Sequence, residues 1–165
     1  MKVQYAKFVG LMIMLAAIWI GCNKNKEVKP QPLPIPDQFL AHYEATNYHY
    51  EVFGNTPEGI RVDFYFTGPI TGDLINGTMT GIDYYLTRPD GVGEINAHAT
   101  ITTNDSALIT VYITGYVYDD YEIQDKIVRF ESGYKKYSWL NNTVLTGRGN
   151  MTSDTTFEVD YFYAP

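Results

Sequence analysis

His98 and Asp83 are the two residues of this sequence whose types and positions suit proton transfer. His98 alternates with Thr100 and Thr102 in a segment that has the pattern of a strand. If that face points into a barrel, an imidazole with an ordinary pKa of about 6.5 could act as a general acid or base. If the face points outward, His98 is a surface or hydrogen-bonded histidine.

Asp83 lies in a second strand-like segment, directly before an aromatic residue. A carboxylate enclosed by apolar residues has a raised pKa and can transfer a proton. Asp83 could equally accept backbone hydrogen bonds and hold the adjoining turn. The catalytic candidates are therefore His98 and Asp83, and the sequence leaves open whether the protein is an enzyme.

Aromatic residues provide candidates for ligand binding, because 15 of the 165 residues are tyrosine. In residues 107–118, aliphatic side chains occupy one face, and threonines and tyrosines occupy the other. A face with hydroxyls and rings but no charge is typical of a semi-polar lumen or a binding surface. Tyrosines can also simply cover the outer side of a sheet. The predicted ligand-binding residues are Tyr112, Tyr116, Trp139 and His98.

Composition argues against several other kinds of site. A formal net charge of −7 argues against nucleic-acid binding, and the single Cys22 excludes an intramolecular disulfide. The acidic group of Asp119, Asp120, Glu122 and Asp125 lacks the glycine and bidentate glutamate of a calcium loop, so it is interpreted as a solvated loop. We therefore expect no metal and no cofactor.

The N-terminus has the pattern of an export signal. Lys2 and Lys7 precede an uncharged apolar run at 8–20, which is shorter than the roughly 20 residues that a membrane span needs. Cys22 follows this run directly, so residues 1–21 resemble a bacterial lipoprotein signal peptide with Cys22 as the lipidated residue. Trp19 stands where such signals usually carry leucine, and an ordinary signal peptide or an uncleaved anchor is the alternative.

Residues 22–37 are predicted to be a lipidated cysteine and a proline-rich linker, because prolines alternate there and favour an extended chain. Asn23, rather than aspartate, follows Cys22, which favours an outer-membrane lipoprotein, facing the periplasm or the cell surface. The domain at 38–165 contains 7 Lys and Arg against 17 Asp and Glu, a formal charge of −10.

The domain itself shows no clear helical pattern. Residues 39–50 fit a short helix or a strand equally well, and the rest alternates with a period of two between turn-forming residues. Seven or eight strands of this kind predict a sandwich or a closed barrel. The predicted strands include 60–66, 80–87, 94–103, 107–118, 126–131, 138–148 and 156–163.

Three stretches carry a family resemblance. Residues 68–91 read GPITGDLINGTMTGIDYYLTRPDG, residues 95–109 read INAHATITTNDSALI, and residues 129–149 read RFESGYKKYSWLNNTVLTGRG. Together they resemble the uncharacterised family called domain of unknown function 3237, and YSWLN at 137–141 is the most specific piece. The resemblance implies an all-β fold, a single antiparallel calycin-like barrel of about eight strands, similar to allene oxide cyclase barrels.

Some positions depart from the family pattern. Asp105-Ser106 stands where the family has Asp-Gly, His98 replaces a typical arginine, and Tyr84 replaces a tryptophan. An arginine-based site of the family would therefore be lost here. The resemblance implies a binder of small apolar molecules, or an isomerase or cyclase using the same cavity.

These observations predict a lipid-anchored envelope protein that binds a small apolar or aromatic molecule in its barrel. The alternatives are an isomerase or cyclase, and a surface adhesion or assembly module with a protein or glycan partner. A binder needs a cavity, an enzyme needs His98 or Asp83 inside it, and an adhesion module needs a filled barrel with exposed tyrosines.

Overall fold

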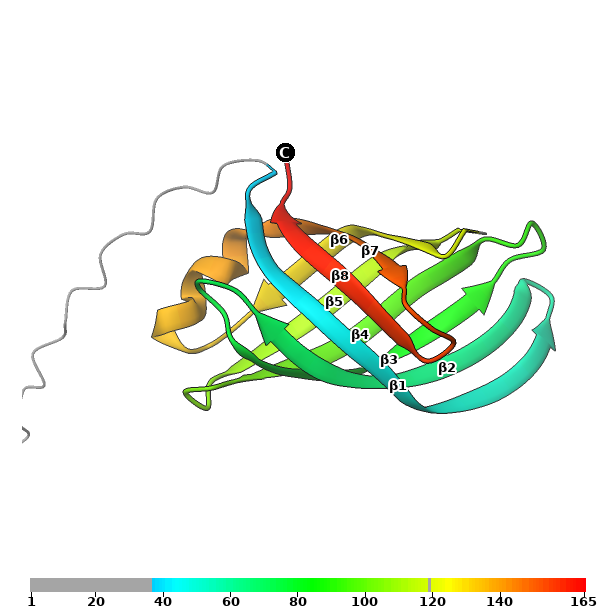
Figure 1. Ribbon diagram of the computed structural model, residues 1–165, viewed down its shortest axis with the longest axis horizontal. Helices are drawn as coiled ribbons and strands as arrows, with labels where there is room; N and C mark the ends of the chain where they lie inside the picture. Colours follow the sequence, from blue (N-terminus) through cyan, green and yellow to red (C-terminus); the bar gives the residue numbers. More distant parts are fainter. Residues whose placement is uncertain (1–36, 119) are drawn as a thin grey trace, which may run out of the picture.

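Eight strands, each paired with its neighbours in the sequence, form a closed antiparallel barrel (Figure 1). The computed structural model describes residues 37–118 and 120–165. β8 returns to pair with β1 and closes the ring, which confirms the predicted eight-stranded barrel. The strands are β1 (Phe39–Thr56), β2 (Gly59–Thr71), β3 (Gly77–Thr87), β4 (Gly93–Thr103), β5 (Leu108–Val117), β6 (Glu122–Glu131), β7 (Val144–Met151) and β8 (Thr156–Tyr163).

The predicted signal peptide at 1–21, Cys22 and the linker up to residue 36 lie outside the described residues. Within the described ranges, no helix is long and apolar enough to cross a membrane.

β5 shows how the alternating pattern builds the barrel wall. Ile109, Val111 and Ile113 are buried inside the barrel, whereas Thr110 and Tyr112 are exposed on its outer side. Since successive side chains of a strand point to opposite faces, the aliphatic face of β5 lines the interior. The tyrosine-bearing face covers the outside, which is the second of the two interpretations that the sequence allowed.

The structure resolves one alternative that the sequence left open and corrects one predicted strand. Residues 39–50 belong to a strand, which continues to Thr56. The strand expected at 138–148 begins only at Val144, because residues Lys135–Asn142 form a 3₁₀ helix, η1. The Asn141 side chain accepts from the Ser132 backbone N–H at 2.7 Å and donates to its carbonyl at 3.0 Å, which fixes this turn beside the end of β6.

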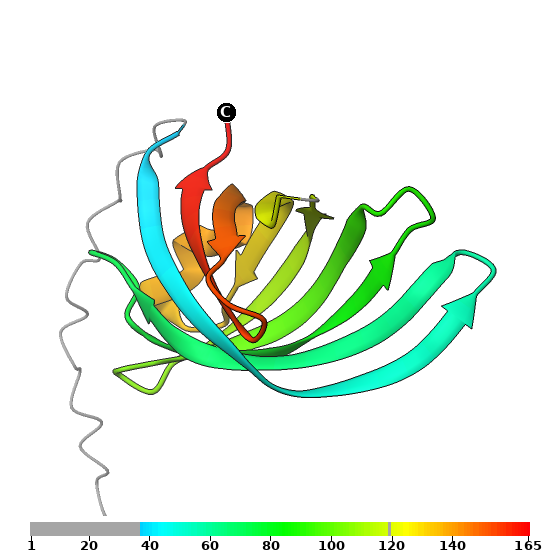
Figure 2. The same ribbon diagram turned by 45° about the vertical axis from the view of Figure 1, so that its right-hand side comes forward.

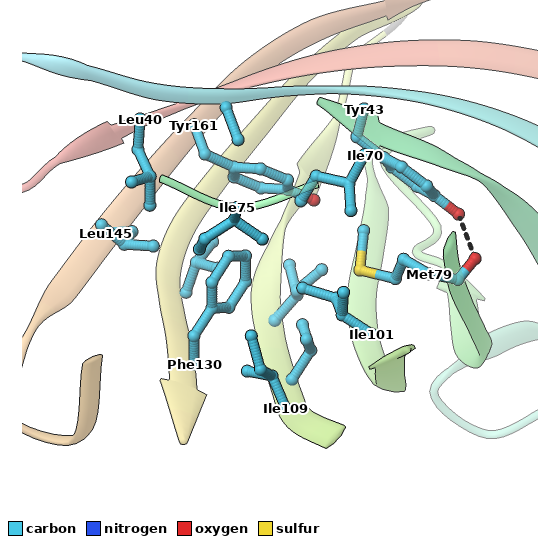
Figure 3. Packing of buried hydrophobic residues seen from close by; sticks show 14 of the residues in the cluster. Leu40, Tyr43, Ile70, Ile75, Met79, Ile101, Ile109, Phe130, Leu145 and Tyr161 are labelled. Carbon is cyan, nitrogen blue, oxygen red and sulfur yellow. Dashed lines mark hydrogen bonds between the residues drawn. The ribbon is translucent and has the colours of Figure 1, made fainter. Parts of the chain in front are cut away.

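One end of the barrel is filled by side chains (Figure 3). Ile75, from the loop between β2 and β3, is fully buried in the centre of this packing. η1 lies across the same end and buries Tyr137 and Leu140. The labelled members of the packed cluster are Leu40, Tyr43, Ile70, Ile75, Met79, Ile101, Ile109, Phe130, Leu145 and Tyr161.

Asp105 ties η1 to the turn between β4 and β5 at this closed end. Its carboxylate accepts hydrogen bonds from Lys136 Nζ at 2.6 Å, from Thr103 Oγ1 at 2.6 Å and from Tyr137 Oη at 2.8 Å. These hydrogen bonds, that of Lys136 foremost, hold the pKa of Asp105 well below its usual range. The next residue, Ser106, has φ 64. Glycine adopts this conformation more easily than serine, so replacement of Ser106 by glycine would suit the turn.

The two ends of the described chain also meet at the closed end. The Asp37 N–H donates to the Tyr163 carbonyl at 2.9 Å, and the Tyr163 N–H donates to the Gln38 carbonyl at 3.0 Å. The opposite end of the barrel carries the turns that join β1 to β2, β3 to β4, β5 to β6, and β7 to β8. We call it the open end.

The β1–β2 hairpin extends beyond the rest of the open end, as Figure 2 shows. β1 pairs with β8 only up to Thr46, so its last residues pair with β2 alone. Tyr50 and Val52 in this extension are both 63% exposed. The Tyr50 ring lies 6.3 Å from that of Phe64, which faces the barrel interior, so apolar surface continues from the barrel onto the hairpin.

Candidate ligand-binding cavity

A cavity of about 210 Å³ occupies the barrel interior at the open end. Its walls are mainly apolar, with three carboxylates, Asp83, Asp125 and Asp154. Small-molecule sites in proteins are typically concave, apolar and supplied with a few polar groups. The aromatic rings of the wall belong to Tyr43, Phe64, Phe66, Tyr85, Phe157 and Tyr161, with Tyr121 at the β5–β6 turn.

Three of these rings form one side of the cavity, on the adjacent strands β8, β1 and β2. Tyr43, Phe66 and Phe157 contact one another edge to face, with centroid separations of 5.9 to 6.2 Å. The Tyr43 hydroxyl donates to the Met79 carbonyl at 3.3 Å, which anchors its ring to β3 (Figure 3). Edge-to-face contacts favour a fixed geometry, so this side of the cavity is a rigid aromatic surface.

A bulge in β6 directs Asp125 into the cavity. Ile127 pairs with Thr114 on β5, but Asp125 pairs with the following residue, Gly115, so Lys126 is an extra residue in β6. A bulge of this kind changes the direction in which the preceding side chains point. Asp125 and Val128 are consequently both buried inside the barrel, and Lys126 and Ile127 between them are exposed.

Asp125 lies between two glycines that also occupy inward positions. Gly115 of β5 and Gly147 of β7 pair with it on either side. A Cβ on Gly147 would lie 2.8 Å from the Asp125 Oδ2, and a Cβ on Gly115 would lie 2.7 Å from the Asp125 Cα. Both contacts are too short, so Gly147 leaves the space that the Asp125 carboxyl group occupies, and Gly115 leaves room for the β6 backbone at Asp125.

Burial changes the proton affinity of Asp125 strongly. Its side chain is almost inaccessible, with the residue 4% exposed, and burial, together with the negative charge of Asp83, raises its pKa to about 7. No group in the described ranges donates a hydrogen bond to its carboxyl oxygens. Asp125 therefore exchanges a proton near neutral pH without a protein partner.

Asp83, on β3, is the second carboxyl group of the cavity wall. Burial raises its pKa to about 7, and the nearby Asp63 adds to this, whereas the hydrogen bond from the Asn96 N–H and the charge of Arg61 oppose it. The Asn96 N–H lies 2.9 Å from the Asp83 Oδ1. Asp83 thus faces the cavity and also accepts a backbone hydrogen bond, which comes from within β4 and not from the adjoining turn.

The other residues predicted for a site lie elsewhere. His98 is on the outer surface, with its ring 5.1 Å from that of Tyr112 and 6.1 Å from that of Tyr84. Tyr112 and Tyr116 are also on the outer face of β5. Trp139 is in η1 at the closed end, 6.4 Å from the Tyr163 ring. Of the predicted residues, only Asp83 lines the cavity, because β4 and β5 turn their polar faces outward.

Asp125 was not among the predicted site residues. It was assigned to a solvated acidic loop, and that assignment is wrong, because Asp125 lies within β6 and is buried. Counting alternate residues back from Val128 places Asp125 outside, whereas counting forward from Ile123 places it inside. When the inward positions counted from the two ends of a strand disagree in this way, the sequence indicates a bulge.

Tyr121 stands at the rim of the cavity in an unusual conformation. Its φ is 65, and its side chain is largely exposed although it contributes to the cavity wall. The Tyr121 N–H donates to the Tyr118 carbonyl at 2.9 Å, and its carbonyl accepts from the Met151 N–H at 3.1 Å. A left-handed backbone at a bulky residue is uncommon and often occurs at functional sites, so Tyr121 is a further candidate for ligand contact.

Sequence comparison places the chain in a family. The model of DUF3237, a protein of unknown function, matches residues 45–164. The chain belongs to the DUF3237 family. The match covers β2 to β8, most of β1, and the two carboxyl groups of the cavity wall, Asp83 and Asp125. A search of curated proteins found no match.

Solved structures share the fold of this DUF3237 member at low sequence identity. A β-barrel-like protein from Acinetobacter baumannii is 23% identical, with a TM-score of 0.68 over 81% of this chain and 99% of that one. A conserved protein of unknown function from Rhodopseudomonas palustris is 20% identical, with a TM-score of 0.69 and the same coverage. An enzyme from Penicillium herquei is 23% identical, with a TM-score of 0.60 over 80% and 97% of the two chains.

Proposed function

We propose that this DUF3237 protein binds a small aromatic or other apolar molecule in the cavity at the open end. The observation that carries the proposal is the contrast between the two ends of one barrel. The closed end is filled by side chains, whereas the open end keeps a hollow of about 210 Å³ lined by rings. A protein interior is normally close-packed, so a preserved aromatic hollow favours a ligand.

The β1–β2 hairpin supports the proposal, since it continues the apolar surface past the rim. Tyr50 and Val52 are exposed there beside Phe64 of the cavity wall. A ligand longer than the cavity would bury these side chains, and burial of apolar surface is favourable. The unfilled interior weighs against the adhesion module, for which a filled barrel was expected.

An isomerase or cyclase is the second candidate, favoured by the two carboxyl groups in the wall. Asp83 and Asp125 have pKa values raised to about 7, and a group with a pKa near the working pH is an efficient acid or base. The structural neighbour from Penicillium herquei is described as an enzyme, so this barrel fold is compatible with catalysis.

The binding proposal is tested by titrating the protein with 1-ethylnaphthalene and following the fluorescence of this probe. Ala97 is buried in the cavity wall, and Ala97→Phe should raise the dissociation constant more than about tenfold by filling the hollow. Thr100→Phe, on the outer face of the same strand, is the matched control and should bind normally. Ile95→Trp serves as a second filling variant, with folding checked by circular dichroism. Wild-type affinity in both folded filling variants would contradict the proposal.

We also propose that the protein is a lipoprotein anchored through Cys22, in the outer membrane. The apolar run before Cys22 supports this, and the anchored segment would join the barrel at Asp37, at its closed end. Labelling with a palmitate analogue is expected for the wild type and lost in Cys22→Ser. Equal labelling of the two proteins would overturn the anchor.

A further inference from the structure

The charges around the cavity have one sign. Its described lining residues include Asp83, Asp125 and Asp154 but no lysine, arginine or histidine. The whole domain at 38–165 has a formal charge of −10. A carboxylate or phosphate ligand would meet no cation in this site and would be repelled, because like charges repel strongly where water is scarce.

Asp125 has capacity for a partner that the protein does not provide. Its side chain is buried beside Gly147, and no donor in the described part of the chain bonds to its carboxyl group. An ionised carboxylate that is buried without a partner is costly. A ligand that brings a cationic donor would remove that cost, whereas a purely apolar ligand would increase it.

Asp83 provides a second carboxylate acceptor for the same cationic group of the ligand. The Asn96 N–H occupies its Oδ1 at 2.9 Å, and its second oxygen makes no hydrogen bond among the described residues. The charges of Asp83 and Asp125 act on each other, so one cation near both would stabilise both. The surrounding rings of Phe64, Tyr85 and Tyr161 suit an aromatic body and also attract a cation over their faces.

We propose that the ligand of this cavity is an aromatic amine, whose ammonium group binds between Asp83 and Asp125 while its ring contacts the aromatic wall. The proposal rests on the cavity being a ligand site, and it adds the charge and the chemical class of the ligand. Asp125 is the main anchor, because Asp83 already accepts the Asn96 hydrogen bond.

Affinity for the amine should rise with pH, since the carboxyl groups must be ionised to hold a cation. The titratable groups that share the cavity with Asp125 are carboxyl groups and tyrosine hydroxyls from several strands and turns. None of the described lining residues is a lysine, arginine or histidine. On the outer side of β2, Arg61 and Asp63 pair with each other at 2.8 Å and act on Asp83. The cavity groups are Tyr43 of β1, Asp83 and Tyr85 of β3, Tyr121 and Asp154 of the turns, and Tyr161 of β8.

The test uses three probes with one ring system and different charges: 1-naphthylmethylamine, 1-ethylnaphthalene and 1-naphthylacetate. At about pH 8 the amine should bind at least about tenfold more tightly than ethylnaphthalene, and the acetate should bind most weakly. At about pH 6 the preference for the amine should shrink, as the carboxyl groups take up protons while the amine keeps its charge.

Asp125→Asn should abolish the preference for the amine without weakening ethylnaphthalene binding, because it removes a charge that an apolar ligand would bury. Asp73→Asn is the matched control, because it removes the same charge at the exposed loop of the closed end. The proposal is overturned if ethylnaphthalene binds and the amine binds no better, or if Asp125→Asn weakens all three probes equally. The first of these results would leave the binding cavity itself intact, whereas binding of none of the probes would remove both proposals.

Discussion

Asp125→Asn is expected to raise the free energy of unfolding by about 3 kcal/mol at about pH 8. Burial raises the pKa of Asp125 from its ordinary 3.8 to about 7, so the folded protein holds this proton more tightly than the unfolded chain. The stability from the protonated side chain is fully present below pH 3.8, declines as the pH rises, and is lost above about pH 7. The amide of asparagine carries no charge at any of these pH values and avoids the loss.

Urea denaturation of the wild type and Asp125→Asn between about pH 4 and pH 8 measures this difference. The gain in the free energy of unfolding should be large at about pH 8 and fall below about 1 kcal/mol at about pH 4. Asp73→Asn, which removes an exposed carboxylate, should change stability by no more than about 0.5 kcal/mol. A gain in Asp125→Asn that does not vary with pH would show that the buried charge is not its cause.

Ile75→Ala is expected to lower the free energy of unfolding by about 3 kcal/mol. Ile75 is fully buried and lies at the centre of the packed end, between side chains of several strands (Figure 3). Removing three of its carbon atoms leaves a hollow that the surrounding strands cannot close, because each is fixed by hydrogen bonds on both sides.

Denaturation followed by circular dichroism measures the loss. Ile127→Ala, at a 41% exposed position on the outer face of β6, is the control and should change stability by about 0.5 kcal/mol or less. Affinity for 1-ethylnaphthalene should be unchanged in folded Ile75→Ala, since Ile75 does not line the cavity. A loss of stability no larger than that of the control would contradict the central role of Ile75.

The barrel could be predicted from the sequence because its strands alternate regularly. In β5, the period-two pattern identifies both faces correctly, but it does not say which face is inside. That choice depends on closure of the whole sheet: the aliphatic side of β5 fills the interior, and the tyrosines remain outside. Tyr112 and Tyr116 were therefore correctly placed on one face of β5, but that face is the outer side of the barrel and does not line the cavity.

The site was harder to predict for a different reason. Asp83 sits in a regular strand, so its inward position follows from its neighbours. Asp125 faces inward only because Lys126 is an extra residue in β6. Its carboxyl group has space beside Gly147 of β7, and its backbone has space beside Gly115 of β5. These neighbours come from three different strands. They can be identified only when the register of strand pairing is known, and a single sequence does not state it.

The start of β1 and the end of β8 meet at the closed end, and this has a topological consequence. The Asp37 N–H and the Tyr163 carbonyl are one hydrogen bond apart, and every strand neighbours the next around the ring. The barrel is thus a continuous circle of eight strands in which only the neighbours β8 and β1 are not joined by a turn. Domains with adjacent ends generally tolerate circular permutation, so the order of the strands around the ring, rather than which two neighbours are left unjoined, specifies this barrel.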